Sequence, residues 1–308
     1  MKRASGAEPL VSIGLPVHNG ANYLRKAADT ILEQTYKRLE LIISDNASTD
    51  ATSVICAELA AKDSRIRVLR NDRNIGAAAN YNKVFEAAQG RYFKWAAHDD
   101  VLAPTFVERA VAVLENDPSI VLCTSKTGRI DHAGEMTGSY FSDSSWDEAS
   151  AAARFHSVAF TPHACVAVFG LIRRDDLANT PLIAPYVNSD RVLLAELALR
   201  GRLHELSDIL FFRRDHPGSS LRTFPDHRQR VVWFDPSKSA SLSFPEWSEV
   251  LGYTAAVGRT RLPLRQRARA WGTIISLFAS RWRPLLADFK YAAIGRANSQ
   301  CHWQILRS

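Results

Sequence analysis

The first 125 residues of this chain alternate short apolar runs with stretches of helical periodicity, and this alternation restricts the possible folds more than any other feature. Such a pattern is typical of βα units, which build a mostly parallel sheet covered by helices. Because ligands of open α/β sheets bind beyond the carboxyl ends of the strands, the polar segments after the strands should converge on one crevice. The predicted strands lie at residues 10–15, 39–44, 66–70, 91–95 and 120–124, and the predicted helices at 21–33, 50–62, 77–88 and 104–116.

The rest of the chain is less regular. A Ser- and Asp-rich loop, SYFSDSSWDEAS, leads into a helix and is followed by an apolar run over 166–172 and a helix over 190–200. Prolines and tryptophans interrupt residues 225–263, and beyond them an apolar helical stripe is expected to break or kink at Pro284. We therefore predict a domain over 9–225 with halves 9–125 and 126–225, a linker over 226–258, and a basic amphipathic helical extension over 259–308.

The positive charge of the chain is concentrated in that extension. The chain has 39 basic and 32 acidic residues, a net charge of +7, but residues 259–308 alone hold ten basic residues and one acidic residue. An argument from basicity therefore concerns the extension and not the rest of the chain. An apolar stripe beside arginines is typical of a helix that binds anionic lipid, and equally of a helix that packs on its own protein or in a dimer. The extension has no recognised nucleic-acid-binding motif, so we predict no nucleic acid partner.

The cysteines and the N-terminal sequence exclude several classes of protein. The four cysteines are widely separated and lack the spacing of a structural zinc site. No apolar run of signal-peptide length precedes Pro9, and none reaches the roughly 18 to 20 residues needed to span a bilayer. We therefore expect a protein of the reducing cytoplasm.

The segment SDNASTD, residues 44–50, directly follows a predicted strand. At the end of that strand the Asp45 carboxylate is placed to accept hydrogen bonds from a nucleobase N–H or a ribose hydroxyl. Asn46, Ser48 and Thr49 suit a tight turn, and Ser48, Thr49 or Asp50 would also suit the N-cap of the next helix. Taken alone, the segment is explained equally well by a ligand site and by a turn with a helix cap.

A longer segment, NDRNIGAAANYNKVFEAAQGRYFKWAAHDDVLAP, follows the third predicted strand. Asn74, Gly76 and Asn80 lie at the start of a predicted helix, whose free N–H groups and dipole favour a phosphate-bearing ligand. Asp99 and Asp100 repel each other unless a cation is near, and Mg²⁺ typically binds one or two carboxylates together with phosphate oxygens. As an isolated pair they are also explained by the solvated start of the next helix.

Two later segments hold further polar side chains. In PYVNSDRVLLAELALRG, Asp190 begins a helix with an apolar stripe, and as an isolated residue it is explained as the N-cap. In FFRRDHPGSSLR, Arg213 and Arg214 precede His216 and a Gly-Ser-Ser turn, and the planar guanidinium of arginine suits bidentate contacts to phosphate. The alternative for His216 is a solvated loop histidine.

Together these motifs resemble the family 2 glycosyltransferases of the GT-A fold. The resemblance rests on VSIGLPVHNGANYLRKAADTILEQTY, LELIISDNASTDAT, RNDRNIGAAANYN and GRYFKWAAHDDVLAP, in the family's order and spacing, and covers residues 9 to about 220. It implies an α/β fold, the GT-A fold of nucleotide-diphospho-sugar transferases, with a mostly parallel central sheet flanked by helices and, here, a C-terminal helical extension. It also implies sugar transfer from a nucleotide-diphosphate donor with inversion at the anomeric carbon and with Mg²⁺ or Mn²⁺.

Carried over position by position, the resemblance assigns roles to the residues above. Asp190 corresponds to the general base, which removes the proton of the acceptor hydroxyl and typically contributes about 10²- to 10⁴-fold in rate. The implied metal ligands are Asp99, Asp100 and His216. The implied donor-binding residues are Pro16, Val17, Asn19, Asp45, Asn46, Asn74, Gly76, Asn80, Asp99 and Arg213.

Two positions depart from the family's pattern. Family members often have a further acid just upstream of the acidic pair, where this chain has Ala97 and His98, so the resemblance leaves open which of Asp99 and Asp100 binds the metal directly. Ser189 stands where the family usually has a glutamate before the base. These departures leave open a non-catalytic sugar-nucleotide-binding protein on a degenerate GT-A scaffold.

The sequence thus predicts a metal-dependent inverting hexosyltransferase that acts in cell-surface polysaccharide or glycolipid synthesis. Its partners would be a nucleotide-diphosphate sugar, a saccharide or lipid-linked acceptor and, through residues 259–308, an anionic membrane surface at the inner face of the cell membrane. A nucleotidyltransferase that makes nucleotide-diphosphate sugars is the rival enzyme. It would need a Gly-rich loop with Arg or Lys after the first strand, which PVHNGAN does not supply.

Overall fold

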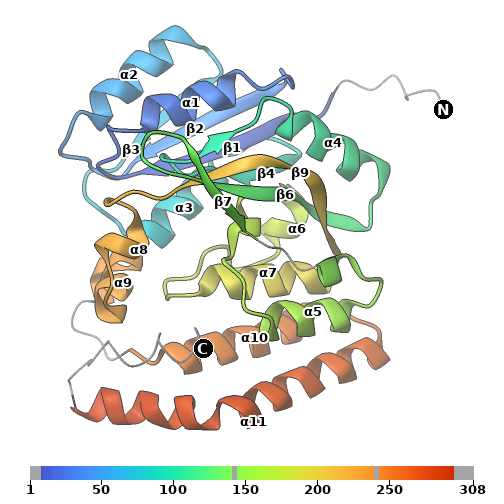
Figure 1. Cartoon of the computed structure of the whole chain (residues 1–308). Helices are drawn as coiled ribbons and strands as arrows, with labels where there is room; N and C mark the ends of the chain where they lie inside the picture. Colours follow the sequence, from blue (N-terminus) through green and yellow to red (C-terminus); the bar gives the residue numbers. More distant parts are fainter. Residues whose placement is uncertain (1–7, 141–143, 239–242, 295–308) are drawn as a thin grey trace.

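The structure, a computed structural model, describes residues 8–140, 144–238 and 243–294 of the chain. Its first part alternates strands and helices as the sequence predicts (Figure 1). The strands are β1 (Val11–Val17), β2 (Leu39–Asp45), β3 (Ile66–Arg70) and β4 (Tyr92–Trp95). The helices are α1 (Leu24–Leu32), α2 (Thr52–Lys62), α3 (Ala77–Glu86) and α4 (Phe106–Asn116). These eight predicted elements are confirmed.

The first four strands are parallel, and their carboxyl ends meet at one edge of the sheet. β1 pairs with β2 so that Val17 lies opposite Asp45, and Asp45 lies opposite Arg70 of β3. β4 pairs with the other side of β1. Every residue of β1 is buried, as expected for a central strand that helices cover on both faces. The loops after β1, β2 and β3 therefore lie next to one another.

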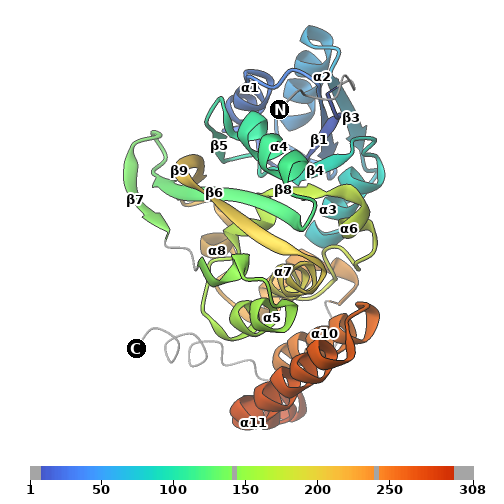
Figure 2. The ribbon, with the colours of Figure 1, turned by 90° about the vertical axis from the view of Figure 1, so that its right-hand side faces the viewer.

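The second part of the sheet is mixed. Its strands are β5 (Val101–Leu102), β6 (Ile120–Ile130), β7 (Met136–Tyr140), β8 (Leu171–Arg173) and β9 (Arg202–Arg214). The order in the sheet is β3-β2-β1-β4-β8-β6-β9-β5, with β7 paired to β6 in a hairpin that projects from the body of the protein (Figure 2). β8 runs antiparallel to β4 and β6, and β5 antiparallel to β9, whereas β9 runs parallel to β6. The sequence analysis did not predict β5, β7 or β9, because β5 has two residues, the side chains of β7 are mostly exposed and charged residues interrupt the alternation of β9.

Helices make up most of the remaining chain. They are α5 (Ala151–Phe160), α6 (Arg174–Ala178), α7 (Ser189–Arg200), α8 (Ser220–Thr223), α9 (His227–Phe234), α10 (Pro245–Arg259) and α11 (Leu264–Ile294). The helices predicted after the Ser- and Asp-rich loop and over residues 190–200 correspond to α5 and α7.

The segment 226–258, predicted as a linker, instead contains α9 and α10. Pro245 is no obstacle, because proline is tolerated in the first turn of a helix. The buried face of α10 includes the charged Glu249 beside Val250 and Tyr253, and this charge weakens the apolar periodicity that sequence analysis relies on.

α11 continues as one helix through Pro284, where the sequence predicts a break or kink. Proline removes one backbone hydrogen bond, and the turns on either side continue the helix. The predicted apolar stripe divides between two environments: Ile274 and Leu285 are buried, whereas Trp271 and Trp282 are exposed. Residues 295–308 of the predicted extension lie outside the described residues.

Apolar side chains cover both faces of the sheet. One buried cluster combines strand residues with α1, α2 and α4, and the other combines them with α3, α5, α7, α10 and α11. α10 and α11 lie against α7 and α5 (Figures 1 and 2). The C-terminal helices therefore share the apolar core with the second part of the chain. In the part of the chain that the structure describes, no helix has both the length and the apolar character that crossing a bilayer requires.

Candidate functional site

Asn46 connects the three loops at the carboxyl ends of β1, β2 and β3. Its backbone N–H donates to the backbone oxygen of Val17 (2.8 Å), and its side-chain amide donates to Asn74 Oδ1 (2.9 Å). Its Oδ1 accepts hydrogen bonds from Asn71 Nδ2 (2.8 Å) and from the backbone N–H of Ile75 (3.0 Å). Because a buried amide must find partners within the protein, these contacts fix the three loops relative to one another.

The turn after β1 is held by the same segment. Asn19 has a φ of 51°, its N–H donates to Ser48 Oγ, and its Oδ1 accepts from the Thr49 N–H, both at 2.9 Å. The N-cap of α2 is Ala51. Of the three predicted capping residues, Asp50 contacts the start of α2, because its Oδ1 accepts from the Thr52 N–H at 3.0 Å, whereas Ser48 and Thr49 hold the neighbouring turn.

Asp45 is buried between this turn and β3. Its Oδ1 accepts from the Ser48 N–H (2.9 Å), and its Oδ2 accepts from Arg70 Nη1 (3.0 Å). Asp45 is 1% exposed, whereas the side chain of Arg70 is 52% exposed. A ligand at this edge would therefore meet Arg70 first, a residue that the sequence analysis did not assign to the site.

The start of α3 forms the next wall of the site. Gly76 has a φ of +87°, and a Cβ at this position would lie 2.5 Å from the backbone oxygen of Phe234, so only glycine fits. Asn80 is buried; its Oδ1 accepts from Ser44 Oγ (2.7 Å), and its Nδ2 donates to the Ser44 backbone oxygen (3.0 Å). Asn80 thus supports the loop from inside, and of the three predicted residues Asn74, Gly76 and Asn80 only Asn74 is exposed.

An open pocket of about 420 Å³ adjoins these loops. Three of its six lining residues are basic, and arginine and lysine are the side chains that most often bind phosphate. The sequence analysis did not single out this basic lining, although the run NDRN was the signal for it. The lining residues are Arg70, Asn71, Asp72, Arg73, Ile75 and Lys83.

Asp99 and Asp100 lie between β4 and β5 and meet the end of β9. Because β5 pairs with β9, the acidic pair lies beside residues more than a hundred positions further along the chain. The Arg214 N–H donates to Asp100 Oδ1, and Arg214 Nε donates to the backbone oxygen of Asp99, both at 2.9 Å. His216 Nε2 lies 2.9 Å from Asp99 Oδ2. The structure thus brings together the three residues predicted to bind the metal.

The two carboxyl groups have different protonation behaviour. Burial acts to raise the pKa of Asp99, but the hydrogen bond with His216 and the proximity of His98 outweigh it and hold that pKa below its ordinary value. Burial, and then the charge of Asp99, raises the pKa of Asp100. A cation would relieve this repulsion, and two carboxylates with one imidazole are ligand types that suit Mn²⁺, while the carboxylates also suit Mg²⁺. Across residues 8–140, 144–238 and 243–294, no three His, Cys, Asp or Glu side chains already form a group that could hold an ion.

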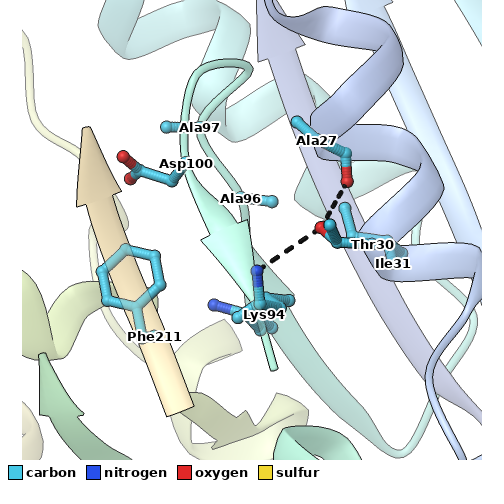
Figure 3. A pocket seen from close by; sticks show the side chains of 9 residues that line it. Ala27, Thr30, Ile31, Lys94, Ala96, Ala97, Asp100 and Phe211 are labelled. Carbon is cyan, nitrogen blue, oxygen red and sulfur yellow. Dashed lines mark hydrogen bonds between the residues drawn. The ribbon is translucent and has the colours of Figure 1, made fainter. Parts of the chain in front are cut away.

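A buried lysine lies beneath the acidic pair. Lys94 of β4 has no exposed surface, and its Nζ donates to the backbone oxygens of Trp95 (3.2 Å) and Phe169. Lys94 and Asp100 line one cavity of about 10 Å³, which is room for about one water molecule (Figure 3). Burial lowers the pKa of Lys94 to about 7. In its protonated form this lysine offsets part of the negative charge above it.

Arg213, predicted to bind the donor, points toward the β6–β7 hairpin. Its guanidinium lies 5.6 Å from the centre of the Tyr140 ring, and its Nη1 lies 3.2 Å from the Tyr140 hydroxyl. Its neighbour Arg214 makes the direct contacts to the acidic pair. The role of Arg213 stays a prediction.

Asp190 is the second residue of α7, and Asn188 is the N-cap. The alternative interpretation of Asp190 as a helix cap is therefore wrong. Its Oδ1 accepts from the Arg191 N–H at 2.9 Å. Burial raises the pKa of Asp190 above its ordinary value. A carboxylate with a raised pKa is a stronger base than an ordinary aspartate, which suits proton transfer.

Tyr81 is affected by the charges of both the acidic pair and Asp190. This residue of α3 follows Asn80, and the sequence analysis did not assign it to the site. Burial raises the pKa of Tyr81, and the charges of Asp99, Asp100 and Asp190 raise it further. The charges of the two carboxylates predicted for the metal and of the carboxylate predicted as the base therefore all affect one side chain, although the first two lie between β4 and β5 and the third lies in α7.

Comparison with known sequences identifies relatives of this chain. A sequence model described as glycosyl transferase family 2 matches residues 12–180, more than half of the chain. An uncharacterized glycosyltransferase of Rickettsia typhi is 39% identical over 118 residues, which are 37% of this chain and 36% of that protein. Glycosyltransferase GlyG of Streptococcus pneumoniae is 33% identical over 114 residues, 37% of this chain and 38% of GlyG. The chain thus spans little more than a third of the length of these relatives.

Comparison with solved structures identifies the fold. The structure of S. aureus TarS 1-349 in complex with UDP-GlcNAc matches with a TM-score of 0.64 at 14% identity, covering 92% of this chain and 81% of that chain. The mannosyltransferase PcManGT from Pyrobaculum calidifontis, in complex with GDP-Man and Mn²⁺, matches with a TM-score of 0.52 at 16% identity, covering 94% and 87%. These likenesses confirm the predicted GT-A fold.

Proposed function

Since this chain belongs to glycosyl transferase family 2, we propose that it transfers a sugar from a nucleotide-diphosphate donor to an acceptor hydroxyl with inversion. The observation that carries the proposal is the contact of Asp99 with His216 (2.9 Å) and of Asp100 with the Arg214 N–H (2.9 Å), with Asp190 near enough for its charge, like theirs, to raise the pKa of Tyr81. One site then contains carboxylates for a cation at the donor diphosphate and a separate carboxylate for the acceptor proton.

The donor would lie over the carboxyl ends of β1, β2 and β3. Arg70, Arg73 and Lys83 line the pocket there, and their charges suit a nucleotide diphosphate. The positive end of the α3 dipole favours the same ligand. UDP-GlcNAc in TarS and GDP-Man in PcManGT support a nucleotide sugar as the donor class.

Asp99, Asp100 and His216 would hold Mg²⁺ or Mn²⁺. When bound, the ion would supply positive charge to the departing diphosphate. The protein prepares this site by holding Asp100 through the Arg214 N–H and by placing His216 beside Asp99. The Mn²⁺ in PcManGT supports the choice of a divalent ion.

Asp190 would act as the general base. Its carboxylate takes the proton of the acceptor hydroxyl while the acceptor oxygen forms a bond to the anomeric carbon and the bond from that carbon to the diphosphate oxygen breaks. A single displacement of this kind inverts the anomeric centre. The raised pKa of Asp190 means that its carboxylate binds a proton more strongly than an ordinary aspartate does. This favours transfer of the proton from the acceptor hydroxyl to Asp190.

Release of nucleoside diphosphate tests this proposal. UDP-, GDP- and dTDP-sugars are incubated with the protein, Mn²⁺ or Mg²⁺ and a panel of acceptors. We expect turnover with one donor class, loss of turnover with EDTA, and a higher Tm with that donor, because a bound ligand stabilises the folded state. An Asp190→Asn enzyme as fast as the wild type would remove Asp190 as the base. Donor binding without turnover on any acceptor would favour the non-catalytic alternative, whereas the family match disfavours a nucleotidyltransferase.

We also propose that the enzyme works at the inner face of the cell membrane, on a saccharide or lipid-linked acceptor of polysaccharide or glycolipid synthesis. Exposed apolar side chains form a line along α11, with exposed arginines beside them, and the one acidic residue of α11, Asp288, is buried. Anionic headgroups complement this charge, whereas a second copy of the helix would bring arginines together. The apolar residues are Leu264, Trp271, Ile275, Trp282, Leu286 and Phe289, and the arginines are Arg265, Arg267, Arg269 and Arg283.

Vesicle binding tests the membrane proposal. Point substitutions are preferable to a truncation, because Ile274 and Leu277 of α11 are buried in the core. Ile275→Glu combined with Trp282→Glu should abolish cosedimentation with phosphatidylglycerol vesicles and leave activity on a soluble acceptor unchanged. Val54→Glu, at an exposed position of α2, is the matched control. Equal binding of the double variant and the wild type would contradict the proposal.

A further inference from the structure

The C-terminal helices contact the turn that carries Asp190. Glu249 of α10 is almost fully buried. Its Oε2 accepts from Asn188 Nδ2 at 3.1 Å, and its Oε1 lies 4.0 Å from Arg191 Nε. Asn188 and Arg191 flank the Ser189–Asp190 pair in the sequence. One carboxylate of α10 therefore contacts the chain on both sides of the residue proposed as the base.

Asn188 adopts a conformation that needs support. Its φ of 70° and ψ of 14° lie in the left-handed region, where asparagine is more frequent than most residues but still strained relative to glycine. A residue persists in this region when its surroundings over-determine it. The hydrogen bond from the Asn188 amide to Glu249 is one such constraint.

Glu249 is itself held from the opposite side. Its Oε1 accepts from the Tyr253 hydroxyl at 3.1 Å and from Arg281 Nη1 of α11 at 2.9 Å. A buried carboxylate is strongly unfavourable unless hydrogen bonds and opposite charges surround it, and this carboxylate has both. Hydrogen bonds from Asn188, Tyr253 and Arg281 to this one carboxylate favour one arrangement of the elements that carry them.

We propose that Glu249 is a positioning residue for glycosyl transfer. It holds the Asn188–Arg191 turn so that the Asp190 carboxylate faces the acceptor hydroxyl, and it makes the packing of α10 and α11 a condition for full activity. This inference rests on the proposed function, in which Asp190 is the base.

The chain offers a matched control on the same interface. Glu196 of α7 is fully buried and accepts from Arg200 Nη2 (2.8 Å) and from Arg259 Nη2 of α10 (2.7 Å). It therefore joins α7 to α10 as Glu249 does, but it lies six residues beyond Asp190, about 9 Å along the helix. A purely structural role predicts similar consequences for the two glutamates.

The charges around Asp190 give a second readout. Of the charged groups facing Asp190, Arg191 of α7 lowers its pKa and Glu249 of α10 raises it. Cys165, Tyr81 and Tyr186 also face it, and each is neutral near pH 7 because its own pKa is raised. Removal of the charge of Glu249 should therefore lower the pKa of Asp190. The acid limb of the profile of kcat/KM against pH would then move to lower pH, because the base stays deprotonated further into the acid range.

The experiment compares Glu249→Gln, Glu249→Asp and Glu196→Gln in the full chain. We expect Glu249→Gln to lower kcat about tenfold or more, because small misplacements of a reacting group are costly, with donor KM within about twofold of the wild type. Its acid limb moves to lower pH, and Glu249→Asp, which keeps the charge, restores the limb. We expect Glu196→Gln to lower the Tm about as much as Glu249→Gln does, but to leave kcat and the position of the acid limb at their wild-type values.

Equal losses of kcat in Glu249→Gln and Glu196→Gln, or an unchanged acid limb in Glu249→Gln, would overturn the inference. If Glu249→Gln does not fold, Asn188→Gly provides the test: it keeps the left-handed turn, removes the contact to Glu249, and should lower kcat without moving the acid limb. Wild-type kcat in Asn188→Gly would then overturn the inference. Asp190→Asn separates the failure of this inference from the failure of the proposed function. Full activity in that variant would refute the role of Asp190 as the base, whereas the Glu249 variants test only the positioning role of Glu249.

Discussion

Asp99, which we propose for the donor side, and Asp190, which we propose for the acceptor side, are carboxyl groups with opposite surroundings. Asp99 lies 2.9 Å from His216 Nε2, and this contact keeps its pKa low despite burial. Burial raises the pKa of Asp190, with the Arg191 N–H as a partial offset. A carboxylate that stays charged suits a cation, and one with a raised pKa suits proton transfer. The difference in environment therefore supports the two roles that we propose.

The two sides also differ in how they are built. On the donor side, Asn46 and its neighbours join loops that follow adjacent parallel strands. On the acceptor side, Glu249 holds the start of α7 from a helix that comes much later in the chain. The donor side is thus built from local motifs, and the acceptor side depends on the packing of the C-terminal helices.

The largest expected effects on turnover come from removing the charge of Asp190 or of Asp99. Asp190→Asn should lower kcat by about 10²- to 10⁴-fold, the usual contribution of a general base, and leave donor affinity within about twofold. Asp99→Asn should weaken donor and metal binding as well as turnover. Steady-state kinetics with calorimetric titration of the donor separates the two patterns. Unchanged donor affinity in Asp99→Asn would break the comparison.

Loss of the Asn46 side chain, which joins the loops after β1, β2 and β3, should mainly affect stability. Asn46→Ala removes the partner of several buried groups, and each unsatisfied buried group costs about 1–3 kcal/mol, so we expect the free energy of unfolding to fall by about 2–4 kcal/mol. Urea unfolding measures it. Asn179→Ala, at an exposed asparagine that donates to the backbone oxygen of Asp175, is the control and should change little. If Asn46→Ala lowers the free energy of unfolding no more than Asn179→Ala does, the three loops do not depend on Asn46.

His216 should matter for the cation more than for the fold. His216→Gln is expected to weaken Mn²⁺ binding about tenfold or more, measured by calorimetry without donor, because it removes an imidazole from the predicted ligand set. His204→Gln is the control, since His204 Nδ1 lies 2.8 Å from Asp147 Oδ2 in a similar pair that is separate from the acidic motif. Equal Mn²⁺ affinity in both variants would remove His216 from the metal site.

The smallest expected effect is a gain in stability in Asp190→Asn. Because folding raises the pKa of Asp190, the folded state binds more protons than the unfolded state, and wild-type stability falls as pH rises above the unfolded pKa of about 3.9. The variant should therefore be more stable near pH 7, by the order of 1 kcal/mol, as is common when a strained functional group is replaced. The gain should vanish below about pH 4. Urea unfolding at both pH values measures it, and a loss of stability near pH 7 would show that the carboxylate is well accommodated.

Sequence analysis was most successful where structure depends on neighbours in the chain. The first four strands and helices follow from periodicity, and SDNASTD and HDD were correctly placed at the ends of strands. It missed β9, whose charged residues hide the alternation, and α10, whose buried face includes Glu249. It also missed Arg70, because nothing in its local sequence indicates that it covers Asp45.

The sequence by itself determined the order of the first four strands and helices and the residue types available for chemistry, since backbone preference and periodicity act over a few residues. Only the tertiary structure decided which charges meet. His216 reaches Asp99 across 117 positions because β5 pairs with β9, and Glu249 reaches Asn188 across 61 because α10 packs on α7. Burial follows from the same long-range packing, and burial together with these partners sets the protonation of Asp99, Asp100 and Asp190.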